Sequence, residues 1–234
     1  MPDQIAMLFD LDGTLVHSSP DLAKAANRML TRLGLPSASE SEVESWIGHG
    51  VTQLVHRCLT GEHDGRADER LAEHALEIFR SEYLGTGFDG TRLLDGGIEV
   101  LDALIASGFP CALVTNKPLV PTLAVLEKFD LMSRFESVVC GNTLRVSKPA
   151  AAPLHHALGV CETSRGWMVG DSETDSAASA AAGLPFIALQ GGYGRDADPD
   201  SFPLRPALLL KALGDLLDEN GLPIEMLSRP EDFS

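Results

Sequence analysis

Five short apolar runs alternate with helical patterns along most of this chain, and this alternation constrains the fold more than any other feature. The apolar, β-rich runs are Ile5–Phe9, Cys111–Thr115, Ser137–Cys140, Trp167–Gly170 and Phe186–Leu189. The helical patterns before and between the later runs are Ile98–Ser107, Val120–Phe129, Ala150–Leu158 and Glu173–Ala182. Strict alternation of strands and helices predicts an α/β fold with a doubly wound parallel sheet.

The segment between the first strand and Asp95 breaks this alternation. Its apolar residues recur with a helical period over four stretches and form no convincing strand. The stretches are Pro20–Leu33, Glu40–Ile47, Val51–Leu59 and Arg66–Tyr83. Roughly seventy inserted helical residues predict an α-helical cap domain. We therefore expect an α/β core of residues 1–16 and 87–234, and a cap of residues 17–86.

The charge balance limits the classes of partner. The 234 residues contain 18 Lys and Arg against 34 Asp and Glu, a formal net charge of −16. Such a charge argues against nucleic acids and anionic membranes as partners. The apolar runs are too short to span a bilayer, and the first strand begins too early for a signal peptide. The four cysteines show no metal-binding spacing, so we expect buried thiols and a cytoplasmic protein.

Two carboxylates follow the first predicted strand, in the segment Asp10–Leu15 (DLDGTL). Side chains at positions i and i+2 of a strand point to the same face, so Asp10 and Asp12 lie side by side. Their repulsion must be offset by a cation or by a proton on one of them. Because Asp-Gly is also common in simple turns, the other strand ends must decide whether this pair belongs to a site.

Polar groups also follow the other strands. Thr115–Pro118 (TNKP) follows the second run, Gly170–Asp175 (GDSETD) follows the fourth, and Ser147–Pro149 (SKP) precedes the third core helix. Open parallel sheets carry their chemistry at the carboxyl ends of the strands. An anionic substrate would be repelled by the overall charge. The site must therefore supply local positive charge from a metal ion, a lysine or helix N-termini.

These four segments resemble, in order and spacing, the motifs of the haloacid dehalogenase superfamily, specifically its phosphatases. Phe9–Leu22 (FDLDGTLVHSSPDL), Trp46–Val51 (WIGHGV) and Thr115–Pro118 are similar to the bacterial phosphoglycolate phosphatases within it. The resemblance implies a Rossmann-like core with an inserted helical cap. It also implies Mg²⁺-dependent hydrolysis of a small phosphate monoester, with 2-phosphoglycolate favoured, through an aspartyl-phosphate.

The resemblance implies a role for each core residue. Asp10 would be the nucleophile, Asp12 the acid and base, and Lys148 would neutralise developing charge. Mg²⁺ would bind the side chains of Asp10 and Asp171 and the peptide carbonyl of Asp12. The remaining implied residues support these groups. Asp175 would act outside the metal's ligand shell, and the expected substrate-binding residues are Thr115, Asn116, Gly13 and His49.

Several positions admit more than one interpretation. His49, between two glycines, is equally compatible with a substrate contact and a simple turn. Arg57 is expected on the cap surface, although it could reach a substrate carboxylate. Lys117 is expected to line the entrance to the site. His17, where relatives tend to carry Asp, is interpreted as a hinge or surface residue. Two segments are expected to be loose: the loop Gly191–Gly194, and the tail from about Leu222.

Three alternative functions stay open at this point. The first is hydrolysis of another small phosphate, such as a sugar phosphate or pyrophosphate. The second is a phosphomutase of the β-phosphoglucomutase type, and the third is a phosphate-binding scaffold without activity. A dehalogenase is disfavoured because Asp12 is present. The expected partner is a small anionic phosphorylated metabolite, and the sequence leaves open whether the protein is a monomer or a homodimer.

Overall fold

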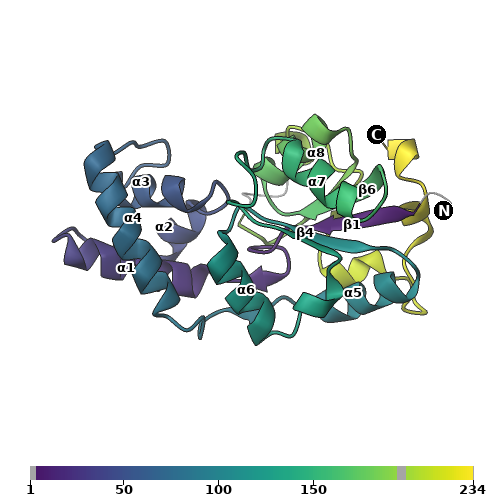
Figure 1. Cartoon of the computed structure of the whole chain (residues 1–234), viewed down its shortest axis with the longest axis horizontal. Helices are drawn as coiled ribbons and strands as arrows, with labels where there is room; N and C mark the ends of the chain where they lie inside the picture. The colour runs from purple at the N-terminus through teal and green to yellow at the C-terminus, as the bar shows by residue number, and fades with distance from the viewer. Residues whose placement is uncertain (1–3, 194–198, 234) are drawn as a thin grey trace. The chain divides into compact units, whose positions relative to one another are not determined.

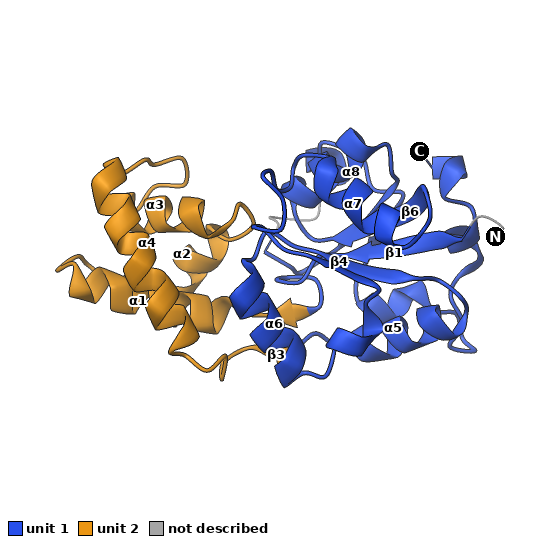
Figure 2. Ribbon diagram, viewed as in Figure 1, with its two compact units in different colours: residues 1–15, 93–234 blue, residues 16–92 orange. Residues whose placement is uncertain are grey.

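The computed structural model describes residues 4–193 and 199–233 (Figure 1). The chain divides into two compact units (Figure 2). Unit 1 contains Met1–Leu15 and Leu93–Ser234, and unit 2 contains Val16–Arg92. Unit 2 is thus an insertion within the sequence of unit 1.

A six-stranded parallel sheet forms the centre of unit 1, in the order β5-β4-β1-β6-β7-β8. Its strands are β1 (Ile5–Phe9), β4 (Cys111–Val114), β5 (Ser137–Val139), β6 (Arg165–Gly170), β7 (Phe186–Leu189) and β8 (Leu208–Leu210). The chain adds strands on one side of β1 and then, from β6, on the other. The boundary between β1 and β6 is therefore the topological switch point, where open α/β sheets place their ligands.

Helices cover both faces of this sheet. They are α5 (Gly97–Ala106), α6 (Leu119–Lys128), α7 (Ala152–Val160) and α8 (Glu173–Ala182). Figure 1 shows α7 and α8 on one face and α5 on the other. Because both faces are covered, every residue of β1, β4 and β7 is buried. The doubly wound α/β fold is confirmed, and the five predicted strands lie within two residues of their expected limits.

Unit 2 is mainly helical. Its helices are α1 (Ser19–Arg32), α2 (Glu40–Ser45), α3 (Val51–Thr60) and α4 (Glu69–Leu84). Two short strands, β2 (Val16–His17) and β3 (Arg92–Leu93), pair where the chain enters and leaves this segment. Buried small and apolar residues of α1 pack against α4, the helix it contacts most. This helical insertion fits a cap, whereas the expected limits of 17–86 stay a prediction.

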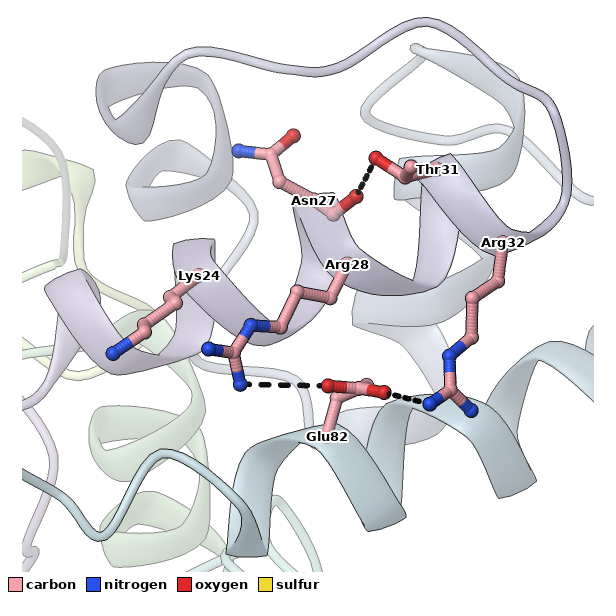
Figure 3. Close-up of a pocket in the computed structure, with 6 residues that line it drawn as sticks. All are labelled: Lys24, Asn27, Arg28, Thr31, Arg32 and Glu82. Atoms are coloured by element: carbon pink, nitrogen blue, oxygen red, sulfur yellow. Dashed lines mark hydrogen bonds and ion pairs between the residues drawn. The ribbon is translucent and has the colours of Figure 1, made fainter.

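A shallow groove of about 510 Å³ lies along α1 and α4 within unit 2 (Figure 3). Glu82 of α4 lies 3.4 Å from Nη1 of Arg28 and 2.7 Å from Nη2 of Arg32. The two ion pairs connect the helices across the groove. The groove contains none of the predicted site residues; it is lined by Lys24, Asn27, Arg28, Thr31, Arg32 and Glu82.

The four cysteines are buried free thiols, as expected: Cys58, Cys111, Cys140 and Cys161. Burial raises the pKa of the Cys58 and Cys111 thiols to about 12, so neither is a ready nucleophile. Within residues 4–193 and 199–233, no helix combines the length and apolar character that crossing a bilayer requires.

The prediction of a loose tail from about Leu222 is wrong. The tail contains two short 3₁₀ helices, Glu225–Ser228 and Pro230–Phe233, and the second packs against β6. The carbonyl of Leu227 accepts a hydrogen bond of 3.0 Å from Nε1 of Trp167, whose ring also contacts that of Phe233. The tail contains only a few apolar residues, which show no helical or strand period. The position of the tail therefore depends on its contacts with the indole of Trp167 in β6.

Replacing Leu227 by Ala should lower the free energy of unfolding by about 2–4 kcal/mol, because its side chain is fully buried. Leu222→Ala is the matched control, since the Leu222 side chain is 57% exposed, and it should change stability little. Urea denaturation followed by tryptophan fluorescence measures both. Equal effects of the two substitutions would contradict the docked tail.

Candidate active site

Adjacent strands bring the predicted motifs to one edge of the sheet in unit 1. Phe9 of β1 pairs with Val169 of β6 and with Leu113 of β4. The residues that follow these strands therefore leave the sheet together. Asp10 comes from β1, Thr115 from β4 and Asp171 from β6. All three are buried, at the carboxyl edge where the topology predicts a ligand.

A buried ammonium joins the acidic residues of this edge. Nζ of Lys148 lies 2.9 Å from Oδ1 of Asp10 and 2.6 Å from Oδ1 of Asp175. Burial by itself would lower the pKa of Lys148, but the two carboxylates outweigh it and raise that pKa. Lys148 is therefore a permanent cation.

Asp10, Asp171 and Asp175 can each direct one carboxylate oxygen to a common point, with these atoms within 4.8 Å of one another. When all are ionised, the three carboxylates and the ammonium of Lys148 leave two negative charges unbalanced among the residues of this cluster that the structure describes. Such a set is costly without a further cation. Its oxygens are those that hard divalent cations prefer. The cluster can therefore hold a metal ion.

Asp175 is already engaged by protein groups. Its Oδ2 accepts hydrogen bonds from the backbone N–H and the hydroxyl of Ser172, at 3.1 and 2.6 Å. The Ser172 hydroxyl in turn accepts from the N–H of Asp175, which completes a capping box at the start of α8. With Lys148 on its other oxygen, Asp175 is suited to orienting the site. The expectation that Asp175 acts outside the metal's ligand shell stays a prediction.

Asp171 is held from two sides. Its Oδ1 accepts a hydrogen bond of 3.0 Å from the Thr14 hydroxyl, and its Oδ2 one of 2.6 Å from the Tyr193 N–H. Gly13 has a φ of +90°, and a Cβ there would lie 2.4 Å from Oδ2 of Asp171. A Cβ at Gly192 would lie 2.3 Å from Cβ of Asp171. Glycine is therefore required at both positions for these loops to close on the carboxylate.

The prediction of a simple flexible loop after β7 is therefore wrong for residues 191–193. Tyr193 is buried, and its N–H contacts the site. Gly194, the last residue of that predicted loop, lies outside the described residues. The pair Gly191-Gly192 was the available signal, because adjacent glycines allow backbone to approach another group closely.

The loop after β4 is tied to the Lys148 loop. Nδ2 of Asn116 donates a hydrogen bond of 3.0 Å to the Lys148 carbonyl. Its Oδ1 is buried and has no hydrogen-bond partner among residues 4–193 and 199–233. The Thr115 hydroxyl accepts from the Lys117 N–H at 3.2 Å. These contacts order the segment that is expected to bind phosphate.

Lys117 is a residue whose importance the sequence analysis underestimates. Its Nζ lies 2.7 and 3.0 Å from the two carboxylate oxygens of Asp12. The side chain is almost fully buried, so the prediction that it lines the entrance is wrong. The available signal was the position of Lys117, three residues past the end of β4. Because the lysine side chain is long and flexible, the sequence does not show which carboxylate its ammonium contacts.

The predicted cap residues lie in unit 2. His49 is exposed, and its Nδ1 lies 3.5 Å from Nη1 of Arg57. Arg57 is buried and donates to the carbonyls of Trp46 and His63 at 2.7 and 2.6 Å. The expectation that Arg57 lies on the cap surface is therefore wrong, because its guanidinium holds two loops together. A substrate contact by His49 stays a prediction.

The comparison with known proteins agrees with this fold. The family model described as "Haloacid dehalogenase-like hydrolase" matches residues 7–189. The chain belongs to this family.

Particular relatives are similar over most of their length. A phosphoglycolate phosphatase of Nitrosospira multiformis is 42% identical over 195 residues, covering 82% of this chain and 86% of that protein. One from Chromobacterium violaceum is 38% identical over 216 residues, with coverages of 91% and 95%. A crystal structure described as a predicted phosphoglycolate phosphatase from Haemophilus somnus has a TM-score of 0.83 and 31% identity. It covers 92% of this chain and 97% of that one.

Asp10→Asn should stabilise the metal-free protein more at pH 8 than at pH 4.5. Burial, with a smaller contribution from Asp175 and against the pull of Lys148, raises the pKa of Asp10 from 3.8 to about 6. The folded state therefore holds this proton more tightly than the unfolded state. The corresponding stability is present below about pH 4 and is lost as the pH rises through 6. Asn at position 10 cannot ionise, so the variant does not lose this stability as the pH rises.

Thermal melts in EDTA across this pH range measure the effect, which is about 1–3 kcal/mol for a pKa change of this size. Asp64→Asn is the control, because the Asp64 side chain is 99% exposed and its substitution should give no such pH-dependent gain. A stability difference between Asp10→Asn and wild type that is the same at both pH values would contradict the assigned direction.

Proposed function

We propose that this protein is a Mg²⁺-dependent phosphatase that hydrolyses 2-phosphoglycolate to glycolate and phosphate. The observation that carries the proposal is the buried ion pair between Lys148 and Asp10 beside Asp171, in a chain 38–42% identical to named phosphoglycolate phosphatases. A carboxylate next to a fixed ammonium and further hard oxygen ligands suits phosphoryl transfer, in which positioning and charge stabilisation dominate.

In the first step, a carboxylate oxygen of Asp10 attacks phosphorus while the bond between phosphorus and the glycolate oxygen breaks. Asp12 gives its proton to the departing alkoxide, so glycolate leaves as the alcohol. In the second step, the ionised Asp12 takes a proton from water. The water oxygen attacks phosphorus, and the bond to Asp10 breaks. Both residues are thereby restored, and inorganic phosphate is released.

Other residues bind the phosphoryl group. Lys148 offsets the negative charge on its oxygens, and Thr115 with the backbone N–H of Asn116 holds them in place. The turn at Gly13 brings backbone close to the same group. Because these groups are fixed by buried contacts before substrate arrives, little reorganisation is needed during the reaction.

Mg²⁺ fits the donor set of this site. Asp10, Asp171 and the peptide carbonyl of Asp12 would hold it, with Asp175 and Lys148 orienting the carboxylates. When bound, the ion supplies positive charge to the phosphoryl oxygens. The support is the chemistry of the donors: buried, hard carboxylate oxygens whose charge is not balanced by Lys148 alone within residues 4–193 and 199–233.

The proposed substrate is a small anionic metabolite, and the proposed setting is the cytoplasm. A formal charge of −16 disfavours nucleic acids and anionic membranes as partners. Buried thiols are compatible with a reducing compartment. His49 is proposed as a substrate contact from the cap.

A panel of phosphate esters tests the substrate. We expect kcat/KM for 2-phosphoglycolate to exceed that for sugar phosphates and pyrophosphate by roughly tenfold or more, since a site built for a carboxylate rejects substrates without one. Asp10→Asn should reduce phosphate release by about 10³-fold or more. Equal kcat/KM across the panel would rule out the narrow substrate. Sugar-phosphate isomerisation without phosphate release would identify a mutase.

Lys117→Met should lower kcat/KM about 10- to 100-fold, because it removes the buried ammonium that holds the Asp12 carboxylate. Lys211→Met is the control, since Lys211 is exposed. Steady-state kinetics, with thermal melts to verify folding, measure the effect. Lys117→Arg should recover part of the activity. Wild-type kinetics in a folded Lys117→Met protein would show that this pair does not position Asp12.

A further inference from the structure

A second group of potential metal ligands lies wholly within unit 2. It consists of His17 of β2 and Glu40 and Glu44 of α2. One imidazole nitrogen and one oxygen from each carboxylate lie within 4.8 Å of one another. Three side chains at these separations can reach a single ion, because ligand atoms of one ion are themselves a few ångströms apart.

Local structure explains why the two glutamates converge. Glu40 and Glu44 are four residues apart in a helix and therefore share one face. The start of α2 is fixed by a capping box, in which the Ser39 hydroxyl accepts from the Glu42 N–H and Glu42 reaches back to the Ser39 N–H at 2.7 Å. Glu42 is thus engaged with Ser39 at the N-terminus of α2, whereas Glu40 and Glu44 lie close to His17.

Ser19 orients two of the three side chains. Its Oγ lies 3.2 Å from Nε2 of His17 and donates a hydrogen bond of 3.0 Å to Oε2 of Glu44. Ser19 is fully buried in the first turn of α1. Groups behind the ligands that restrain the imidazole and the carboxylate are the usual support of a metal site.

The charged groups around His17 favour an imidazole that can coordinate a metal. Burial lowers the pKa of His17, the cation of Arg92 lowers it further, and Glu44 and Glu40 oppose them. The two carboxylates supply negative charge that offsets the field of Arg92.

We propose that His17, Glu40 and Glu44 form a second metal site, which binds a divalent transition-metal ion of the Zn²⁺ class. One imidazole and two carboxylates suit Zn²⁺ and its first-row neighbours. The carboxylates of Asp10, Asp171 and Asp175 suit Mg²⁺ instead. A bound ion would tie β2 to α2 within unit 2. The site is independent of the proposed phosphatase activity.

Zn²⁺ titration by calorimetry, with millimolar Mg²⁺ present to occupy the hard oxygen site, tests the proposal. Wild type should bind one Zn²⁺ per chain, and its melting temperature should rise. His17→Ala and Glu44→Gln should weaken this binding by about 100-fold. His156→Ala and Glu73→Gln are matched controls at exposed positions and should bind as wild type does. Unchanged Zn²⁺ affinity in folded His17→Ala and Glu44→Gln would overturn the proposal.

A measurement on the wild-type protein covers the case in which the variants do not fold. Co²⁺ added in the same Mg²⁺ buffer should shift or broaden the ring resonances of His17 in an NMR spectrum before those of His156. If the His17 resonances respond no more strongly than those of His156, the ion does not bind at this cluster.

Discussion

The ammonium of Lys148, buried between Asp10 and Asp175, is the interaction on which the rest of the site depends. Without it, the carboxylates of Asp10 and Asp175 would lose the ammonium that lies within 2.9 Å of both of them. The same residue accepts a hydrogen bond from Asn116 at its carbonyl, which connects the loop after β4. One side chain and its backbone therefore join segments from β1, β4 and α8. The cost of burying these charges is tolerable because they are arranged around a single point.

Most of the fold could be predicted because its signals are local. A buried parallel strand is a short apolar run, and the ends of β1 and β7 were predicted to the residue. By contrast, β8 (Leu208–Leu210) was not predicted. Its three leucines belong to a longer apolar stretch with no clear period, and only pairing with β7 makes them a strand. The docked tail was missed for the same reason: the contact that orders it is an indole on β6.

The site was predictable where a motif ends a strand and less so where a long side chain sets the contact. Asp10 and Asp171 follow strands whose register brings them together, so their proximity follows from topology. Lys117 and Arg57 have flexible side chains whose partners lie far away in sequence or depend on loop packing. Their burial against Asp12 and against Trp46 was therefore visible only in three dimensions.

The central position of β1 has a consequence for how the protein is made. Its two neighbours in the sheet, β4 and β6, begin at Cys111 and Arg165, long after β1 has left the ribosome. Unit 2, a continuous stretch from Val16 to Arg92, can complete its helix contacts before either neighbour is synthesised. The apolar segment of β1 is thus translated first and stays without its partner strands while unit 2, the next segment of the chain, can already fold. Folding of the sheet is therefore set by long-range closure, with the risk of aggregation that such delay brings.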